Sequence, residues 1–360
     1  MRVYYVSSGN AGCYIVRCLL PLVANGWDGD QVSLNLDTKT PENKTLAATN
    51  SDIVVFHRPD CPEKFELARI LKKAGKKIVF DNDDTYKDHD SVKLNDWFDK
   101  EKVARGMAKL NKNADSFAIE ADLVTTTTEW LADEYRKLNP NVVVLPNCVD
   151  PFYFDEPSRN ETDVVRIGVT GSIINSTDLD LAAPIIRHYE KDKRVKIVFF
   201  GLQANRKDNP MTEKIYSEEY KFLDSVDVEW HPAVNADVYY DKLNSLKLDM
   251  MIIPREDNYF NRAKSNLKWL EASMFEIPCL CSGFPDGKSP YQVNPHDREN
   301  LVLVNDVKDW IPAIENLINN KQLRVDIGRR ARQYVIENYN INDEKNYKKW
   351  YNAYESILEK

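Results

Sequence analysis

Short apolar runs alternate with amphipathic stretches over the first 150 residues of the chain. Five such runs predict buried strands, at residues 3–6, 52–56, 77–80, 122–125 and 142–145. Between them, apolar positions recur at helical spacing in residues 14–25, 62–74 and 129–138, and a long polar helical stretch spans 92–113. Strands that alternate with helices predict a parallel sheet that is covered on both faces.

A second alternation follows a polar stretch at 151–163 that contains two prolines. Further strands are predicted at 165–170, 195–200, 226–230, 248–253, 279–281 and 301–304, with a helix at 179–190 and an aromatic-rich final helix near 343–358. The pattern predicts an α/β protein with two similar halves. We place the domains at 1–150 and 164–340, joined by a linker at 151–163 and followed by a helical segment at 341–360.

Residues 261–280 read as a loop, a helix and a buried strand. Ser265 is a candidate N-cap, because its hydroxyl can accept from a free backbone N–H of the first turn. Lys264, Lys268 and Glu271 lie three or four residues apart, which predicts that they share a helix face. Lysines at a helix N-terminus favour a bound phosphate, and the carboxylate could take sugar hydroxyls. The alternative is a surface helix with a Lys–Glu pair.

The loops that follow the predicted strands are the candidate ligand contacts, because doubly wound sheets bind ligands at the carboxyl ends of their strands. If the halves face each other, the loops at 7–13, 81–86, 171–175, 201–206, 230–232 and 255–265 line one cleft. Asp83 and Asp84 could hold a cation, orient or deprotonate a hydroxyl, or simply favour a helix start. We expect Asp81 to be structural. Arg17, a cation among apolar residues, would pair with this acidic loop or meet substrate.

Bulk composition describes an ordinary globular protein, with 360 residues, 42% hydrophobic residues and a formal charge of −8. That charge argues against nonspecific nucleic-acid binding, although it permits a local basic groove. No apolar run approaches the length of a membrane span, and the first run is too short for a signal peptide. The six cysteines show neither a CxxC pair nor a metal spacing, so we expect reduced thiols in a cytosolic protein.

Several motifs in order resemble GT-B glycosyltransferases, specifically the glycosyltransferase family 4-like (group 1) set. They are Leu145-Pro146-Asn147-Cys148-Val149-Asp150, residues 166–172, residues 264–272 with Ile277-Pro278, and Gly12 to Arg17 with Pro21 and residues 81–84. The resemblance implies two Rossmann-like domains facing across a cleft, the first for the acceptor and the second for the nucleotide sugar. It also implies a C-terminal helix that crosses back to the N-terminal domain.

The resemblance further implies a glycosyltransferase that moves a sugar from a UDP- or GDP-sugar to an acceptor hydroxyl, with retention and with no obligate cofactor or metal. The residues it assigns to the donor are Gly171, Ser172, His231, Arg262, Lys264, Ser265, Asn266, Lys268 and Glu271. Those assigned to the acceptor are Gly9, Gly12, Tyr14 and Arg17, and the catalytic candidates are Asp83, Asp84 and Glu256. Gly9 and Gly12 would let the first loop approach a ligand closely, with a tight turn as the alternative.

The chain departs from this family at two places. Relatives often carry Glu-x7-Glu, and Glu271 matches the second glutamate, but Ala263 stands where the first is expected. Glu256 is the candidate replacement. The cation pair that relatives carry after the first strand of the second domain is missing from residues 171–178, and Arg262 and Lys264 are its candidate replacements.

Several acceptors and one non-enzymatic role stay open. The acceptor could be a glycan or lipid-linked sugar reached by peripheral membrane contact, a hydroxymethylated DNA base as in phage enzymes, or a protein or small molecule. Local lysines and arginines at 72–77 and 100–112 could serve the DNA acceptor. A non-catalytic sugar-nucleotide-binding protein is the alternative that Ala263 permits.

Overall fold

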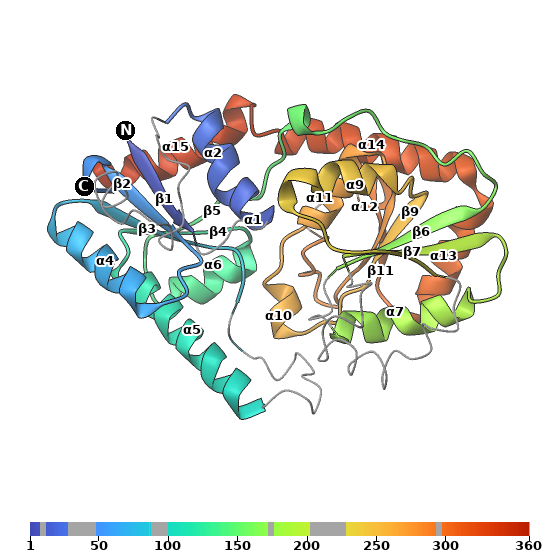
Figure 1. The fold of residues 1–360 in the computed structure, drawn as a ribbon, viewed down its shortest axis with the longest axis horizontal. Coiled ribbons are helices and arrows are strands. Elements are labelled where there is room, and N and C mark those ends of the chain that lie inside the picture. The colour runs from blue at the N-terminus through green and yellow to red at the C-terminus, as the bar shows by residue number, and fades with distance from the viewer. Residues whose placement is uncertain are drawn as a thin grey trace.

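The computed structural model describes residues 1–7, 12–27, 48–85, 87, 100–171, 176–201, 228–292 and 297–359. Two parallel sheets stand side by side, each with helices on both faces (Figure 1). No helix in the described part of the chain is long and apolar enough to cross a membrane. All six cysteines are free thiols, as predicted.

The first sheet has five parallel strands in the order β1-β2-β3-β4-β5. They are β1 (Val3–Ser7), β2 (Ile53–His57), β3 (Lys77–Asn82), β4 (Leu123–Thr126) and β5 (Val142–Val144). Side chains of β1, β2 and β3 alternate between two apolar clusters, one on each face. One cluster includes α4 (Pro62–Lys73), α5 (Lys100–Glu120) and α6 (Glu129–Arg136), and the other includes η1 (Ile15–Leu19) and α2 (Leu20–Ala24).

The helix predicted at residues 14–25 is interrupted. It begins as α1 (Gly12–Tyr14), continues as the five-residue π-helical turn η1, and ends as α2. Gly26 follows at a φ of +57°, which ends the helix as predicted.

The second sheet has six parallel strands in the order β11-β10-β9-β6-β7-β8. They are β6 (Val165–Thr170), β7 (Val195–Phe200), β8 (Val228–His231), β9 (Met250–Ile253), β10 (Cys279–Ser282) and β11 (Val302–Val304). Because β9 returns to the other side of β6, the strand order reverses between these two strands. Such a switch point leaves a crevice at the carboxyl ends, where ligands bind.

Helices cover both faces of the second sheet. One face packs on α7 (Ser176–His188) and α13 (Trp310–Asn319), and the other on α9 (Tyr239–Ser245) and α11 (Leu267–Met274). The long helix α14 (Lys321–Tyr339) contributes to both apolar clusters. The shorter elements are η3 (Pro151–Tyr153), η6 (Ala236–Val238), α10 (Tyr259–Arg262), α12 (Asp297–Asn300) and η7 (Val307–Asp309).

After α14 the chain crosses back to the first domain, where α15 (Glu344–Leu358) lies beside α2 (Figure 1). Trp350 and Tyr354 of this helix are buried in the first-domain core, and Tyr354 stacks on Trp27 at 5.2 Å between ring centroids. The two crossing segments pair at Val149, whose carbonyl accepts from Ile341 N at 2.8 Å. The predicted fold class, including the returning helix, is confirmed.

Candidate functional site

The site begins at the switch point of the second sheet, where β6 ends at Thr170 and Gly171 follows. Lys268, the second residue of α11, donates from Nζ to the carbonyl of Thr170. Glu271 lies one turn further along and is buried, whereas Lys268 is half-buried. Burial lowers the pKa of Lys268 to about 7 and raises the pKa of Glu271 to about 8. Because α11 is buried from Trp269 to Met274, the alternative of a surface helix with a Lys–Glu pair is wrong.

Arg255 supplies a second cation that the sequence analysis did not select. It is buried, and its Nη1 donates to Asp178 at 2.7 Å and to the side-chain oxygen of Asn261 at 3.2 Å. Its charge also contributes to the lowered pKa of Lys268, after burial itself. The signal was available in the sequence, because Arg255 follows the buried strand β9 almost directly at a carboxyl end.

Lys264 precedes α11 and faces the first domain. Its Nζ lies 2.8 Å from both carboxylate oxygens of Asp84 and 3.8 Å from the ring centroid of Phe260. The predicted helix face shared by Lys264, Lys268 and Glu271 is therefore wrong, since α11 begins only at Leu267.

Ser265 and Arg262 lie close to Lys264 in the sequence. Contrary to the prediction, Ser265 is not the N-cap of α11; the N-cap is Asn266, whose side chain makes no capping hydrogen bond. The Ser265 hydroxyl instead accepts from Asn147 Nδ2 at 2.9 Å. Arg262 pairs with Asp257 at 2.6 Å and with Asp286 at 2.6 Å.

Of the first-domain carboxylates, Asp81 and Asp83 are buried and Asp84 is partly exposed. Asp81 is buried, accepts from Arg17 Nε at 3.1 Å and from the Thr125 hydroxyl at 2.6 Å. Its predicted structural role is confirmed. Arg17 is fully buried and also donates to the carbonyl of Leu145, so these contacts account for it without an acceptor.

Asp83 is buried beside Arg58 and His57. Arg58 Nε donates to the Asp83 carboxylate, and His57 Nε2 lies 3.5 Å from Asp83 Oδ1. The other ring nitrogen of His57, Nδ1, lies 2.9 Å from the Ser7 hydroxyl. Burial alone would raise the pKa of Asp83, but Arg58 and His57 hold it well below its usual range. Arg58 also donates to Asp84 at 3.0 Å, so Asp84 is shared between Arg58 and Lys264.

A cavity of about 450 Å³ lies between the two domains beside Lys264. Its first-domain wall consists of Thr127, Thr128, Glu129, Trp130, Asp133, Val144 and Pro146, none of which the sequence analysis selected. The second-domain wall consists of Arg262, Lys264, Asn266, Gly287, Lys288, Ser289, Pro290 and Tyr339. Loops at the carboxyl ends of both sheets thus meet around one cavity, although among the described residues only the loop at 255–265 of the six predicted loops lines it.

The other predicted residues lie in varied surroundings. Glu256 is exposed and accepts from Asn258 Nδ2 at 3.1 Å. His231 Nε2 lies 2.7 Å from Glu229, which forms a two-pronged ion pair with Arg166. Tyr14 is buried in the first-domain core, and Gly12 has open space where a Cβ would be. Gly9 and Ser172 lie outside the described residues.

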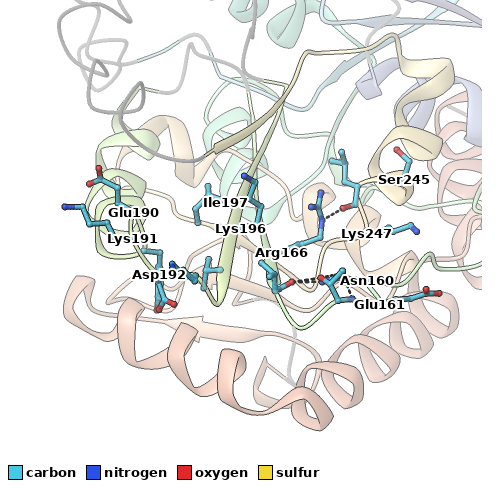
Figure 2. Close-up of a pocket in the computed structure, with 16 residues that line it drawn as sticks. Asn160, Glu161, Arg166, Glu190, Lys191, Asp192, Lys196, Ile197, Ser245 and Lys247 are labelled. Carbon is cyan, nitrogen blue, oxygen red and sulfur yellow. Dashed lines mark hydrogen bonds between the residues drawn. The ribbon is translucent and has the colours of Figure 1, made fainter.

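A larger cavity, of about 900 Å³, opens at the other end of the second sheet (Figure 2). Side chains of both charges surround it, among them Lys191, Asp192 and Lys196. It lies where β6 and β7 begin, opposite the carboxyl ends at which parallel sheets bind ligands. We therefore place the candidate site at the interdomain cavity.

No protein-family model matches the chain, and neither does any curated protein. Several solved structures, in contrast, match the fold of the chain. TarM of S. aureus is 16% identical over 86% of this chain, with a TM-score of 0.59, and the chain spans only 58% of TarM. Sucrose-phosphate synthase from Thermosynechococcus elongatus is 12% identical, with all of both chains covered and a TM-score of 0.65.

Anabaena HepE, solved in complex with UDP and glucose, is 11% identical over 100% of this chain and 98% of HepE, with a TM-score of 0.63. At such identities the likeness concerns the architecture alone. The two facing parallel sheets, the switch-point crevice and the returning C-terminal helix all agree with it. The chain therefore has the GT-B fold of glycosyltransferases.

Proposed function

We propose that this protein is a glycosyltransferase that takes a sugar from a nucleotide diphosphate sugar and passes it to an acceptor hydroxyl. The observation that carries the proposal is the cluster of cations at the second-domain switch point. Arg255 is buried and Lys268 is half-buried beside the end of β6, and Lys264 lines the interdomain cavity. Cations in a water-poor site suit a diphosphate group.

In this proposal the nucleotide lies along the second domain. The diphosphate contacts Lys264 and Lys268, and Glu271 accepts from the ribose hydroxyls. During transfer the bond from the sugar C1 to the diphosphate oxygen breaks, and a bond from the acceptor oxygen forms. The cations stabilise the charge that develops on the leaving diphosphate. We propose retention of configuration and independence from a metal, as the family resemblance implies.

Asp84 is the better candidate for the acceptor hydroxyl than Asp83. Asp83 is buried and engaged by Arg58 and His57, whereas the Asp84 side chain keeps 17% of its surface exposed. Asp84 contacts Lys264, which lines the cavity, and a carboxylate at such a position can orient a hydroxyl or accept its proton. Glu256 stays a weaker candidate.

The departure at position 263 has a physical account. Ala263 is fully buried and belongs to the apolar cluster that contains Leu131 and Tyr135 of the first domain. An unpaired glutamate in that environment would cost several kcal/mol. The same observation favours a second candidate function, a protein that binds a nucleotide sugar without transferring it.

UDP-sugars are the donors to test first, because HepE holds UDP and glucose. We propose a panel of UDP-glucose, UDP-galactose, UDP-N-acetylglucosamine and GDP-mannose, with release of the nucleoside diphosphate as the readout and calorimetry for binding. Lys264→Ala and Glu271→Ala should lower the release at least tenfold. Lys308→Ala is the matched control, since this lysine is 78% exposed and pairs only locally with Asp306.

The outcomes separate the two candidates. Binding without release would support the non-catalytic protein, and neither binding nor release with any donor would overturn both. A cytosolic location stays a prediction from the reduced cysteines, and a GDP-sugar donor stays the alternative to a UDP-sugar.

A further inference from the structure

The interdomain cavity extends beyond Lys264, away from the proposed nucleotide contacts. Lys264 and Asn266 line it, whereas Lys268 and Glu271 are not among its lining residues. If Lys264 holds the diphosphate, the group on the cavity side is the transferred sugar together with its acceptor. A volume of about 450 Å³ lies in the range of small-molecule sites.

We infer that this cavity is the acceptor subsite and that it takes a neutral ring bearing hydroxyls, the terminal sugar of a glycan. The inference rests on the proposed function and narrows its acceptor. Three independent observations carry it: an aromatic wall fixed in place, a buried hydroxyl without a partner, and carboxylates on the first-domain wall.

The aromatic wall is Trp130, in the first turn of α6. Tyr259 of the second domain meets it edge to face, with 4.7 Å between ring centroids and 81° between planes. The Tyr259 hydroxyl donates to Glu134 at 2.8 Å, which fixes the pair further. Pro146 and Tyr339 add apolar surface to the lining of the cavity. An ordered aromatic wall can pack against the C–H face of a sugar ring at little entropic cost.

The unpartnered hydroxyl belongs to Thr127, just past the carboxyl end of β4. Its side chain lines the cavity, the residue is only 5% exposed, and Oγ1 has no hydrogen-bond partner among the described residues. Leaving a buried hydroxyl unpaired is unfavourable, because the group has lost its hydrogen bonds to water. A hydroxyl of the bound ring would pair with it.

The charges of the lining favour a neutral acceptor over a nucleic acid. Glu129 and Asp133 stand on the first-domain wall, and Arg136 pairs with both. On the facing wall Arg262 is paired with Asp257 and Asp286 and Lys264 with Asp84, and Lys288 is the third lining cation. A phosphate backbone needs a surplus of available cations, whereas two of the three lining cations are already paired and the first-domain wall carries two carboxylates.

The test uses the full chain with UDP present, and its probes are maltose, lactose, N,N′-diacetylchitobiose and a duplex containing 5-hydroxymethylcytosine. Saturation-transfer NMR measures disaccharide binding, and product mass measures transfer. Trp130→Ala should weaken disaccharide binding about tenfold. Thr127→Val, which keeps the shape and removes only the hydroxyl, should weaken it about fivefold. Trp130→Phe should retain most of the binding, and Thr162→Val, exposed and distant, is the control.

UDP binding by calorimetry keeps the two proposals apart. If UDP binds and no neutral disaccharide binds or accepts, the acceptor inference falls and the proposed function stands. If the wild-type protein binds disaccharides but not UDP, and Trp130→Ala loses the disaccharide binding, the sugar-binding cavity stands and the proposed nucleotide-sugar donor falls. Transfer to the duplex alone, or wild-type disaccharide affinity in both Trp130→Ala and Thr127→Val, would overturn the inference.

Discussion

Lys268 and Glu271 show most clearly how the surroundings of a residue decide its chemistry. They lie one turn apart on α11, and the core beneath Trp269 and Leu270 holds that helix so that Glu271 is buried and Lys268 is half-buried. Burial moves the pKa of Lys268 down to about 7 and the pKa of Glu271 up to about 8. Near neutral pH each group is therefore poised to change charge when an anion or a hydroxyl arrives.

Donor binding should depend on the charge of Lys268. In the free protein this lysine loses its proton as pH rises through about 7, whereas a bound diphosphate favours the charged form. The dissociation constant for UDP should rise up to about tenfold between pH 7 and pH 8.5. Calorimetry at pH 8 in buffers of different ionisation enthalpy should detect proton uptake on binding. In Lys268→Arg, whose side chain stays charged, the uptake should vanish, and unchanged uptake there would refute the assignment.

Glu271 should make stability depend on pH in the opposite sense to an ordinary carboxylate. Its pKa of about 8 lies above the usual value, so the folded state holds a proton that the unfolded state has lost between about pH 4.5 and pH 8. Stability from this group is full below that window and falls as pH rises through 8. Glu271→Gln should therefore be more stable than wild type by about 2–4 kcal/mol at pH 8.5 and similar to it at pH 4.5. Urea unfolding at the two pH values measures this, and an equal difference at both would contradict it.

Among the elements, α14 positions α11 through one close approach. Gly328 of α14 lies against the chain that leaves α11, and a Cβ there would come within 2.1 Å of the backbone oxygen of Glu276. Glycine is costly inside a helix, yet here it lets the two segments pack without a clash. The position of Lys268 and Glu271 therefore depends on a residue far from them in sequence.

Gly328→Ala should destabilise the protein by about 2–4 kcal/mol, although alanine is the better helix former by about 1 kcal/mol. Backbone cannot yield as a side-chain tip can, so α11 must shift and UDP binding should weaken too. Gly106→Ala in α5 is the matched control, because nothing lies within 4 Å of a Cβ there. That change should stabilise by up to about 1 kcal/mol. Thermal unfolding compares the pair, and similar effects of both changes would contradict the packing argument.

At the scale of the whole molecule, side chains from the two domains meet across the cleft. Lys264 pairs with Asp84, Ser265 accepts from Asn147, and Tyr259 donates to Glu134. The lysine proposed for the donor diphosphate is thus engaged by a first-domain carboxylate in this structure. A diphosphate must compete with Asp84 for it.

Asp84→Asn should therefore bind UDP more tightly, by about three- to tenfold, because Lys264 loses its charged competitor. Sugar transfer should fall in the same variant, since the carboxylate next to the acceptor is gone. Calorimetry and product formation measure the two effects, and Asp306→Asn, on an exposed surface pair, is the control. Weaker UDP binding in Asp84→Asn would show that the carboxylate does not compete.

The sequence by itself determined the alternation of strands and helices, the two halves and the loops that carry ligand contacts. These follow from local periodicity, because each strand or helix must bury its apolar positions wherever it packs. It also selected Lys264, Lys268 and Glu271. Only the tertiary structure decided which partners these groups contact. It pairs Arg17 with Asp81, and it brings Thr127, Trp130 and Pro290 together around one cavity. Partners such as Lys264 and Asp84 are 180 residues apart, and no local pattern encodes the packing of two domains that brings them together.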